Sequence, residues 1–183
     1  ALELYRRKLT DPIKISPEDR SDTPSYLFDL VTAGDGQLVG RPVNQFVQLA
    51  CFNKERLEVP PATLEEMEQE SESTNFGMAL QLKDLFWSAE AFDAGEAMEA
   101  ALAKRPPDPD RQSKVTQWLH WLESASYQQN IRFLNNQRSL RKALIAGELD
   151  WITCWSSSLR ELRDQMNDKL ALAPLPKGPS TKL

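Results

Sequence analysis

One long stretch without a helix breaker most strongly constrains what this chain can fold into. Residues 110–146 contain neither glycine nor proline, and Gly147 follows at the position where many helices end. From residue 115 onward, apolar side chains recur at helical spacing and form one broad face. That face consists of Val115, Trp118, Leu119, Leu122, Ala125, Phe133, Leu140, Ala143 and Leu144. The pattern predicts a single helix over 115–145.

A second uninterrupted segment, residues 149–172, follows directly after a short turn. Its apolar residues step by three and four positions, which is typical of a helix–helix seam. The seam consists of Ile152, Trp155, Leu159, Leu162 and Met166. Further helices are expected from Pro42 and from Asn75, and we find no alternating strand pattern of useful length. The predicted fold class is therefore all-α: an irregular helical N-terminal part followed by a long antiparallel α-helical hairpin, forming a helical bundle.

Prolines divide the chain into its predicted parts. Residues 104–113, with the sequence KRPPDPDRQS, are the clearest linker. The linker separates a helical N-terminal part, 1–103, from the hairpin, 114–173. The proline-rich tail, 174–183, is expected to be disordered. The pattern leaves open whether 1–103 and 114–173 form one core or two.

The middle of the N-terminal part is strongly acidic. Residues 58–100 contain eleven acidic residues and one basic residue, Lys83, whereas the whole chain has a net charge of −5. Thr63 and Glu66 have the spacing of a capping box, so a helix is expected to begin after Thr63. The acidic side chains form either a solvated face or a docking surface for a basic partner.

The predicted helix 115–145 has a second apolar face, opposite the first. A helix that is apolar on two sides is buried on both, so it lies at the centre of a bundle or offers one face to a partner or to another copy. Two tryptophans at the edges of the apolar stripes could anchor such a partner. The predicted partner-binding residues of the hairpin region 115–170 are Trp121, Tyr127, Ile131, Leu134 and Trp151.

A nucleic-acid-binding subunit is the alternative, because the C-terminal part is basic. Residues 101–183 contain thirteen basic and eight acidic residues. The candidate contacts are Arg132, Arg138, Arg141, Lys142, Arg160 and Arg163. Cations near the end of a helix also favour its dipole, so a structural explanation competes with phosphate binding.

No motif indicates catalysis, a metal or a cofactor. One histidine and no CxxC pair argue against zinc. The glycines at 34 and 36 miss the dinucleotide fingerprint because position 39 is Val39. An enzyme built from scattered carboxylates is a third hypothesis, with Asp108, Asp110, Glu148 and Asp150 as its candidates.

The cysteines and hydropathy indicate where the chain works. Cys51 and Cys154 are far apart and suggest no disulfide framework, so Cys51 is expected to be inert and Cys154 to be a surface thiol. The N-terminus lacks the apolar segment of a signal peptide, and no apolar run reaches the roughly 18 residues that span a bilayer. We therefore expect a cytoplasmic, reducing location. The predicted function is a non-enzymatic helical interaction subunit, an adaptor or assembly factor of a larger intracellular or viral complex.

Overall fold

The computed structural model describes residues 1–102, 106 and 108–179. It separates into two compact units, Ala1–Phe46 and Val47–Leu183. The expected linker over 104–113 falls partly on residues 104, 105 and 107, outside the described residues. The same holds for residues 180–183 of the expected tail. The predicted domain boundaries therefore stay predictions.

The first unit is built from three short helices and the loops between them. The helices are α1 (Leu2–Arg6), α2 (Pro17–Ser21) and α3 (Ser25–Asp29). Phe28 and Val39 are buried, and an isolated antiparallel bridge joins Thr32 to Leu38.

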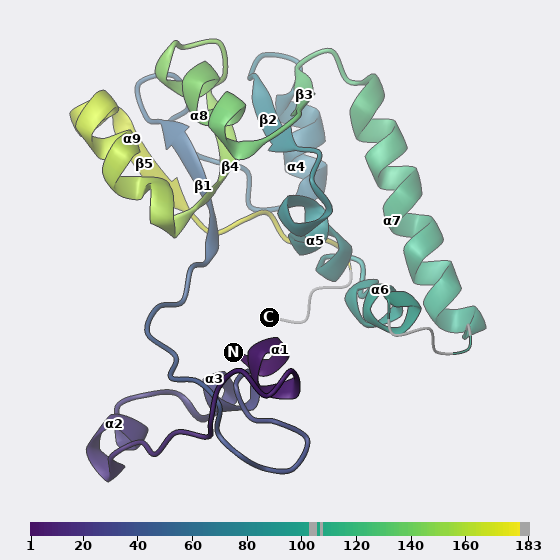
Figure 1. Cartoon of the computed structure of the whole chain (residues 1–183). Helices are drawn as coiled ribbons and strands as arrows, with labels where there is room; N and C mark the ends of the chain where they lie inside the picture. The colour runs from purple at the N-terminus through teal and green to yellow at the C-terminus, as the bar shows by residue number, and fades with distance from the viewer. Residues whose placement is uncertain (103–105, 107, 180–183) are drawn as a thin grey trace. The chain divides into compact units, whose positions relative to one another are not determined.

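The second unit contains a mixed five-stranded sheet (Figure 1). Its strands are β1 (Gln48–Asn53), β2 (Phe76–Ala79), β3 (Ile131–Leu134), β4 (Trp151–Trp155) and β5 (Leu170–Ala173). They lie side by side in the order β3-β2-β4-β1-β5. β2 pairs in parallel with both β3 and β4, whereas β1 runs antiparallel to β4 and β5.

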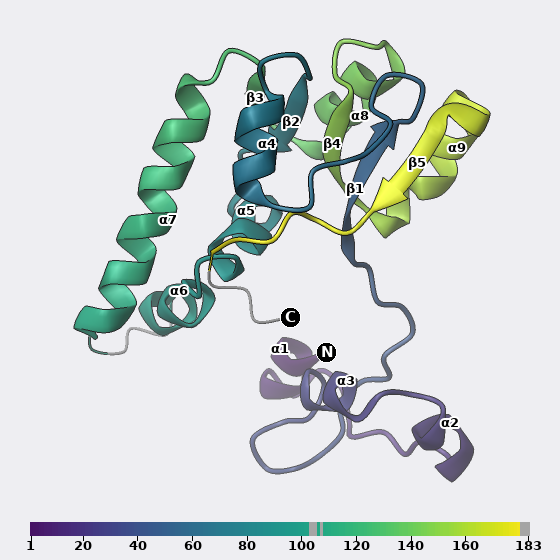
Figure 2. The ribbon, with the colours of Figure 1, turned by 180° about the vertical axis from the view of Figure 1, so that it is seen from behind.

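Helices cover both faces of this sheet (Figures 1 and 2). They are α4 (Leu64–Glu70), α5 (Leu82–Glu90), α6 (Gly95–Leu102), α7 (Pro109–Tyr127), α8 (Gln137–Ile145) and α9 (Leu159–Met166). Single 3-10 turns at Ser156–Ser158 and Asn167–Lys169 flank α9. α4, α5 and α7 share one apolar cluster with Phe76 and Trp151 of the sheet. α8 and α9 share a second cluster, on the other face, with Ile152 and Cys154. No helix among the described residues is long and apolar enough to cross a membrane.

The prediction of an all-α bundle is wrong, because the hairpin does not exist. The stretch predicted as one helix over 115–145 is α7, then β3, then α8. The stretch 149–172 is β4, α9 and β5, with its two 3-10 turns. The segment after Pro42 and the segment after Asn75 each contain a strand, β1 and β2.

The amide-rich residues between Tyr127 and Arg138 explain the first of these breaks. Gln128 leaves the helical conformation, with φ −72° and ψ 130°. The Asn130 side chain donates a hydrogen bond to the Ser71 carbonyl, 2.8 Å away. Asn136 is extended and accepts a hydrogen bond from the Ser139 N–H, so it caps α8. The helix therefore ends at Gln128, and the Asn136 side chain starts the next one.

Two local predictions are confirmed. Thr63 and Glu66 form a capping box: the Thr63 hydroxyl accepts from the Glu66 N–H at 3.1 Å, and the Glu66 carboxylate accepts from the Thr63 N–H at 3.3 Å. Gly147 follows the end of α8 with φ +74°, a conformation that suits glycine.

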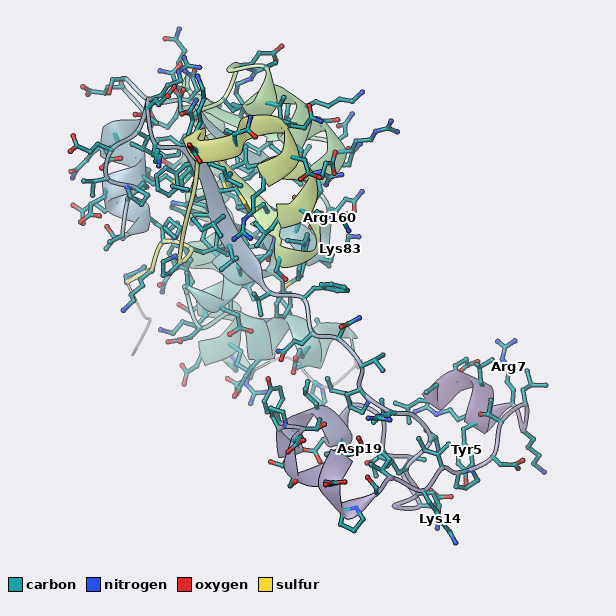
Figure 3. All side chains as sticks on the ribbon, turned by 90° about the vertical axis from the view of Figure 1, so that its left-hand side faces the viewer. Tyr5, Arg7, Lys14, Asp19, Lys83 and Arg160 are labelled. Carbon is teal, nitrogen blue, oxygen red and sulfur yellow. A yellow bond between two sulfur atoms is a disulfide. The ribbon has the colours of Figure 1, made fainter. Side chains whose placement is uncertain are left out.

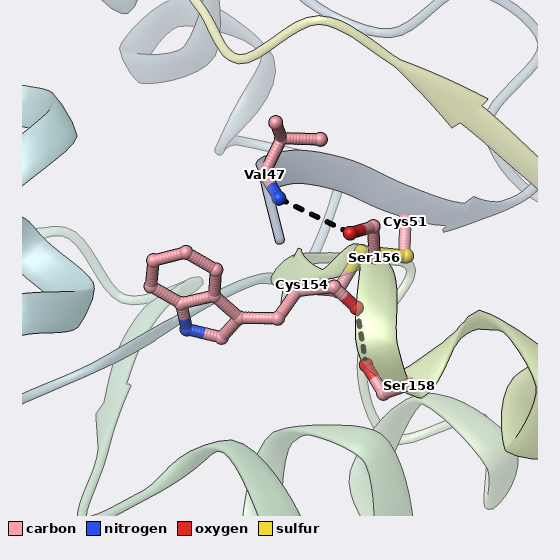
Figure 4. The surroundings of a disulfide bond; sticks show 6 residues. Val47, Cys51, Cys154, Ser156 and Ser158 are labelled. Carbon is pink, nitrogen blue, oxygen red and sulfur yellow. Dashed lines mark hydrogen bonds between the residues drawn. A yellow bond between two sulfur atoms is a disulfide. The ribbon is translucent and has the colours of Figure 1, made fainter. Parts of the chain in front are cut away.

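Cys51 and Cys154 form a disulfide that joins β1 to β4 (Figure 4). Both side chains are fully buried beneath α8 and α9, and their Cα atoms are 5.9 Å apart. The expectation of an inert thiol and a surface thiol is therefore wrong. The sequence could not show the pairing, because the register of β1 on β4 brings the two residues together across 103 positions.

Reducing this bond should lower the free energy of unfolding by about 4 kcal/mol, because the unfolded chain loses a long closed loop as a restraint. Urea unfolding with and without a reductant measures the difference. The double variant Cys51→Ala/Cys154→Ala is the control: it should unfold like the reduced chain and ignore the reductant. An unchanged midpoint for the reduced natural chain would contradict the prediction.

Candidate functional site

The carboxyl ends of three parallel strands lie at one edge of the sheet. β2, β3 and β4 all end there, and antiparallel β1 begins there. β2 and β4 are neighbours, yet α5 after β2 packs on one face and α9 after β4 packs on the other. In open α/β sheets, ligands bind in the crevice outside such strand ends, where successive connections leave on opposite faces.

The Asp84 carboxylate connects the elements that meet at this edge. Asp84, in the first turn of α5, accepts a hydrogen bond from Trp155 Nε1 at 2.6 Å and from Gln137 Nε2 at 3.3 Å. The Gln48 side chain donates to the Asp84 carbonyl oxygen at 2.9 Å. We call Asp84, Trp155, Gln137 and Gln48 the Asp84 cluster. It joins α5, the end of β4, the start of α8 and the start of β1.

Asp84 is fully buried, and no Lys or Arg of the described residues forms an ion pair with it. A buried carboxylate of this kind depends on hydrogen bonds to remain in the fold. Its second oxygen, Oδ2, has no partner, and neither has the buried Oε1 atom of Gln137. The Asp84 cluster therefore holds two acceptors that a hydrogen-bond donor could satisfy.

The segment after β4 is fixed to β1 by backbone and hydroxyl groups (Figure 4). The Ser156 hydroxyl accepts from the Val47 N–H at 3.1 Å, and the Ser156 N–H donates to the Val47 carbonyl at 2.9 Å. The Ser158 hydroxyl donates to the Trp155 carbonyl at 2.7 Å. These contacts hold the partly exposed Trp155 in place from both sides.

The rim of the edge mixes exposed apolar and basic side chains. Leu80, just after β2, and Leu82, the first residue of α5, are 53% and 45% exposed. Lys83, Arg138 and Arg160 are exposed at the starts of α5, α8 and α9. No group of three or more possible metal-binding side chains occurs among residues 1–102, 106 and 108–179.

Comparison with protein families decides the class of this protein. The model of the bacterial extracellular solute-binding protein family matches residues 2–183. The chain belongs to this family. A search of curated proteins finds no match.

Membership overturns the functional expectations drawn from the sequence. The predicted intracellular or viral interaction subunit is wrong, and the nucleic-acid alternative gains no support, because the family binds solutes. The cytoplasmic location is also wrong, because the family is extracellular. The buried disulfide agrees with an oxidising environment outside the cytoplasm. A family defined by solute binding agrees with the expectation of a non-enzymatic protein.

The structure disperses the predicted partner-binding residues. Trp121, Ile131 and Trp151 are buried in the first apolar cluster, and Leu134 packs against the second. Tyr127 is 80% exposed at the end of α7. The four that were expected on the helix 115–145 do not share one helix face, because β3 divides that stretch, and Trp151 lies in β4.

The six cations predicted for nucleic-acid binding lie on β3, α8 and α9. Arg141 forms an ion pair with Glu161 at 2.9 Å, which joins α8 to α9. Arg138 and Arg160 lie in the first turns of their helices, at the edge that holds the Asp84 cluster. The remaining three are exposed: Arg132, Lys142 and Arg163.

The scattered carboxylates have separate structural roles. Asp108 caps α7 by accepting a hydrogen bond from the Asp110 N–H. Asp150 is buried at the opposite edge of the sheet, where it pairs with Arg56 at 2.9 Å and binds Asn75. The structure does not gather these residues into an active site.

A cavity of about 340 Å³ lies beside the acidic helix α4, away from the Asp84 cluster. Trp121 and Phe92 line it together with Glu65 and Glu68. Burial raises the pKa of Glu68, and the nearby Trp121 indole partly offsets this. Lys177 also lines this cavity, so its charges are mixed and favour no single ligand class.

Sequence reasoning missed every polar residue of the Asp84 cluster and placed Trp155 in a helix seam. Asp84 looked like one more acid of the acidic segment. One signal was present: short apolar runs at 76–79 and 151–155, each followed within a few residues by a helix start. Buried parallel strands have this appearance.

Replacing Asp84 by alanine should lower the free energy of unfolding by about 1–3 kcal/mol, because the half-buried Trp155 and Gln137 side chains lose the acceptor for their N–H groups. Asp84→Asn keeps an acceptor oxygen and should cost less. Urea unfolding measures both. The control Asp164→Ala removes an exposed carboxylate from α9 and should change stability by no more than about 0.5 kcal/mol. Equal effects of Asp84→Ala and Asp164→Ala would contradict the role given to Asp84.

Proposed function

We propose that this chain binds a small solute, without changing it chemically, at the edge where β2, β3 and β4 end. One observation carries the proposal: a buried carboxylate fixes a partly exposed indole at the strand ends where α5 and α9 leave on opposite faces. Family membership supports solute binding as the function. The location of the site rests on the geometry of the Asp84 cluster.

The Trp155 side chain would contact the solute directly. Its N–H is held by Asp84, so the ring plane is fixed before binding. A fixed aromatic surface binds at a lower entropic cost than a mobile one. Leu80 and Leu82 add exposed apolar area at the same edge of the sheet. The unpartnered acceptors of Asp84 and Gln137 favour a solute that carries hydrogen-bond donors.

Thermal unfolding in the presence of a panel of sugars, amino acids, polyamines and organic acids tests the proposal. A bound solute at a hundred times its Kd should raise the midpoint by about 5–10 °C, since it stabilises only the folded chain. In Trp155→Ala the shift should be lost, whereas Tyr127→Ala, an exposed aromatic at the end of α7, should keep it. A full shift in Trp155→Ala would place the site elsewhere.

A further inference from the structure

The three helices that begin at the candidate site share an unusual charge. Each carries a basic residue at its second position: Lys83 in α5, Arg138 in α8 and Arg160 in α9. We call these three residues the basic edge. The first turn of a helix favours acidic residues, because the helix dipole places positive charge there.

The rest of the chain follows that preference. Among the other helices of the described residues, the second position is acidic in five of six: Glu3, Glu18, Glu65, Glu96 and Asp110. The exception is α3, which has Tyr26. Among the described helices, a basic residue occupies the second position only in the three that start at the strand ends. Helix stability alone therefore does not explain the basic edge.

Contacts of the Asp84 cluster bring the three helix starts together. Asp84 follows Lys83, and its carboxylate binds Gln137, which precedes Arg138. It also binds Trp155, at the end of the strand that leads into α9. Figure 3 shows Lys83 and Arg160 at the same edge of the second unit.

The positive charge of the basic edge is not neutralised locally. None of its members forms an ion pair within the described part of the chain, whereas nearby Arg141 is paired with Glu161. Asp84, the other acid in these first turns, is fully buried and directed to Trp155 and Gln137. Besides the exposed Leu80 and Leu82, this surface carries three unpaired cations beside helix N-termini, an arrangement that attracts anions.

We infer that the solute carries an anionic group, a carboxylate or a phosphate, which the basic edge binds. This inference rests on the proposed function and names its substrate class. The buried acceptors Asp84 Oδ2 and Gln137 Oε1 provide a second, independent indication of a ligand. A hydroxyl or ammonium group on the same solute would give these two atoms a donor. Hydroxy acids, amino acids and sugar phosphates have this chemistry.

Thermal unfolding with matched probes at constant ionic strength tests the charge. The probes are gluconate and glucose 6-phosphate against glucose, glutamate against glutamine, and inorganic phosphate alone. At least one organic anion should raise the midpoint when its neutral counterpart does not. Gluconate or glutamate would indicate a carboxylate, and glucose 6-phosphate a phosphate. A shift with inorganic phosphate would support anion binding by the basic edge itself.

The variant Lys83→Gln/Arg138→Gln/Arg160→Gln should lose at least nine-tenths of that affinity. The control Arg132→Gln/Lys142→Gln/Arg163→Gln removes the same charge from exposed positions outside the three first turns and should keep it. Without solute, the basic-edge variant should melt no lower than the natural chain, because the helix dipole disfavours those cations. A lower melting temperature would assign them a structural role and overturn the inference.

The remaining outcomes separate the two proposals. If neutral probes bind as well as anions, and Trp155→Ala abolishes this binding, the site stands and the anionic class is wrong. If an anion binds and the basic-edge variant binds it equally well, the assignment of anion binding to the basic edge is wrong, which overturns the inference. If no probe of either charge binds, the proposed site itself fails, and the inference fails with it.

Discussion

The parallel pairing of β2 with both β3 and β4 is the constraint on which the rest of the second unit depends. Parallel neighbours cannot be joined by a tight turn, so the chain must cross back over the sheet each time. Helices provide these crossings and begin just after the same edge. Gly77, in β2, leaves room for Leu140 of α8 and for Leu149 to pack directly on the strand. A Cβ atom at this position would lie 2.5 Å from Leu149 Cδ1 and 2.8 Å from Leu140 Cδ2.

The sequence predicted helix ends correctly where the interactions that form them lie within a few residues. The capping box at Thr63 and the helix end at Gly147 depend on contacts within a few residues, and both are present. The fold class depends on distinguishing a short buried strand from part of a helix. The five residues at 151–155 fit either period, because both faces of this strand are covered. The four residues at 131–134 are too few to show a period, and they include the exposed Arg132.

The candidate site could not be predicted in the same way. Trp155 and Asp84 are 71 positions apart, and Gln137 is 53 positions from Asp84. Their meeting is a result of strand order, which no local pattern encodes. Two cations at the same edge, Arg138 and Arg160, were named from the sequence only as candidate nucleic-acid contacts, a function that family membership does not support. Their place in one continuous hairpin was wrong, and the helix starts that unite them with Lys83 became visible only with the sheet.

The disulfide and the candidate site share a strand pair. Cys154 directly precedes Trp155, and Gln48 faces Trp155 in the register of β1 on β4. A covalent bond to Cys51 therefore fixes this register within a few residues of the donors that reach Asp84. A slip of one residue would turn Trp155 to the other face of the sheet, away from α5. Outside the cytoplasm, where the bond persists, oxidation thus stabilises the fold and keeps the indole on the side where Asp84 holds it.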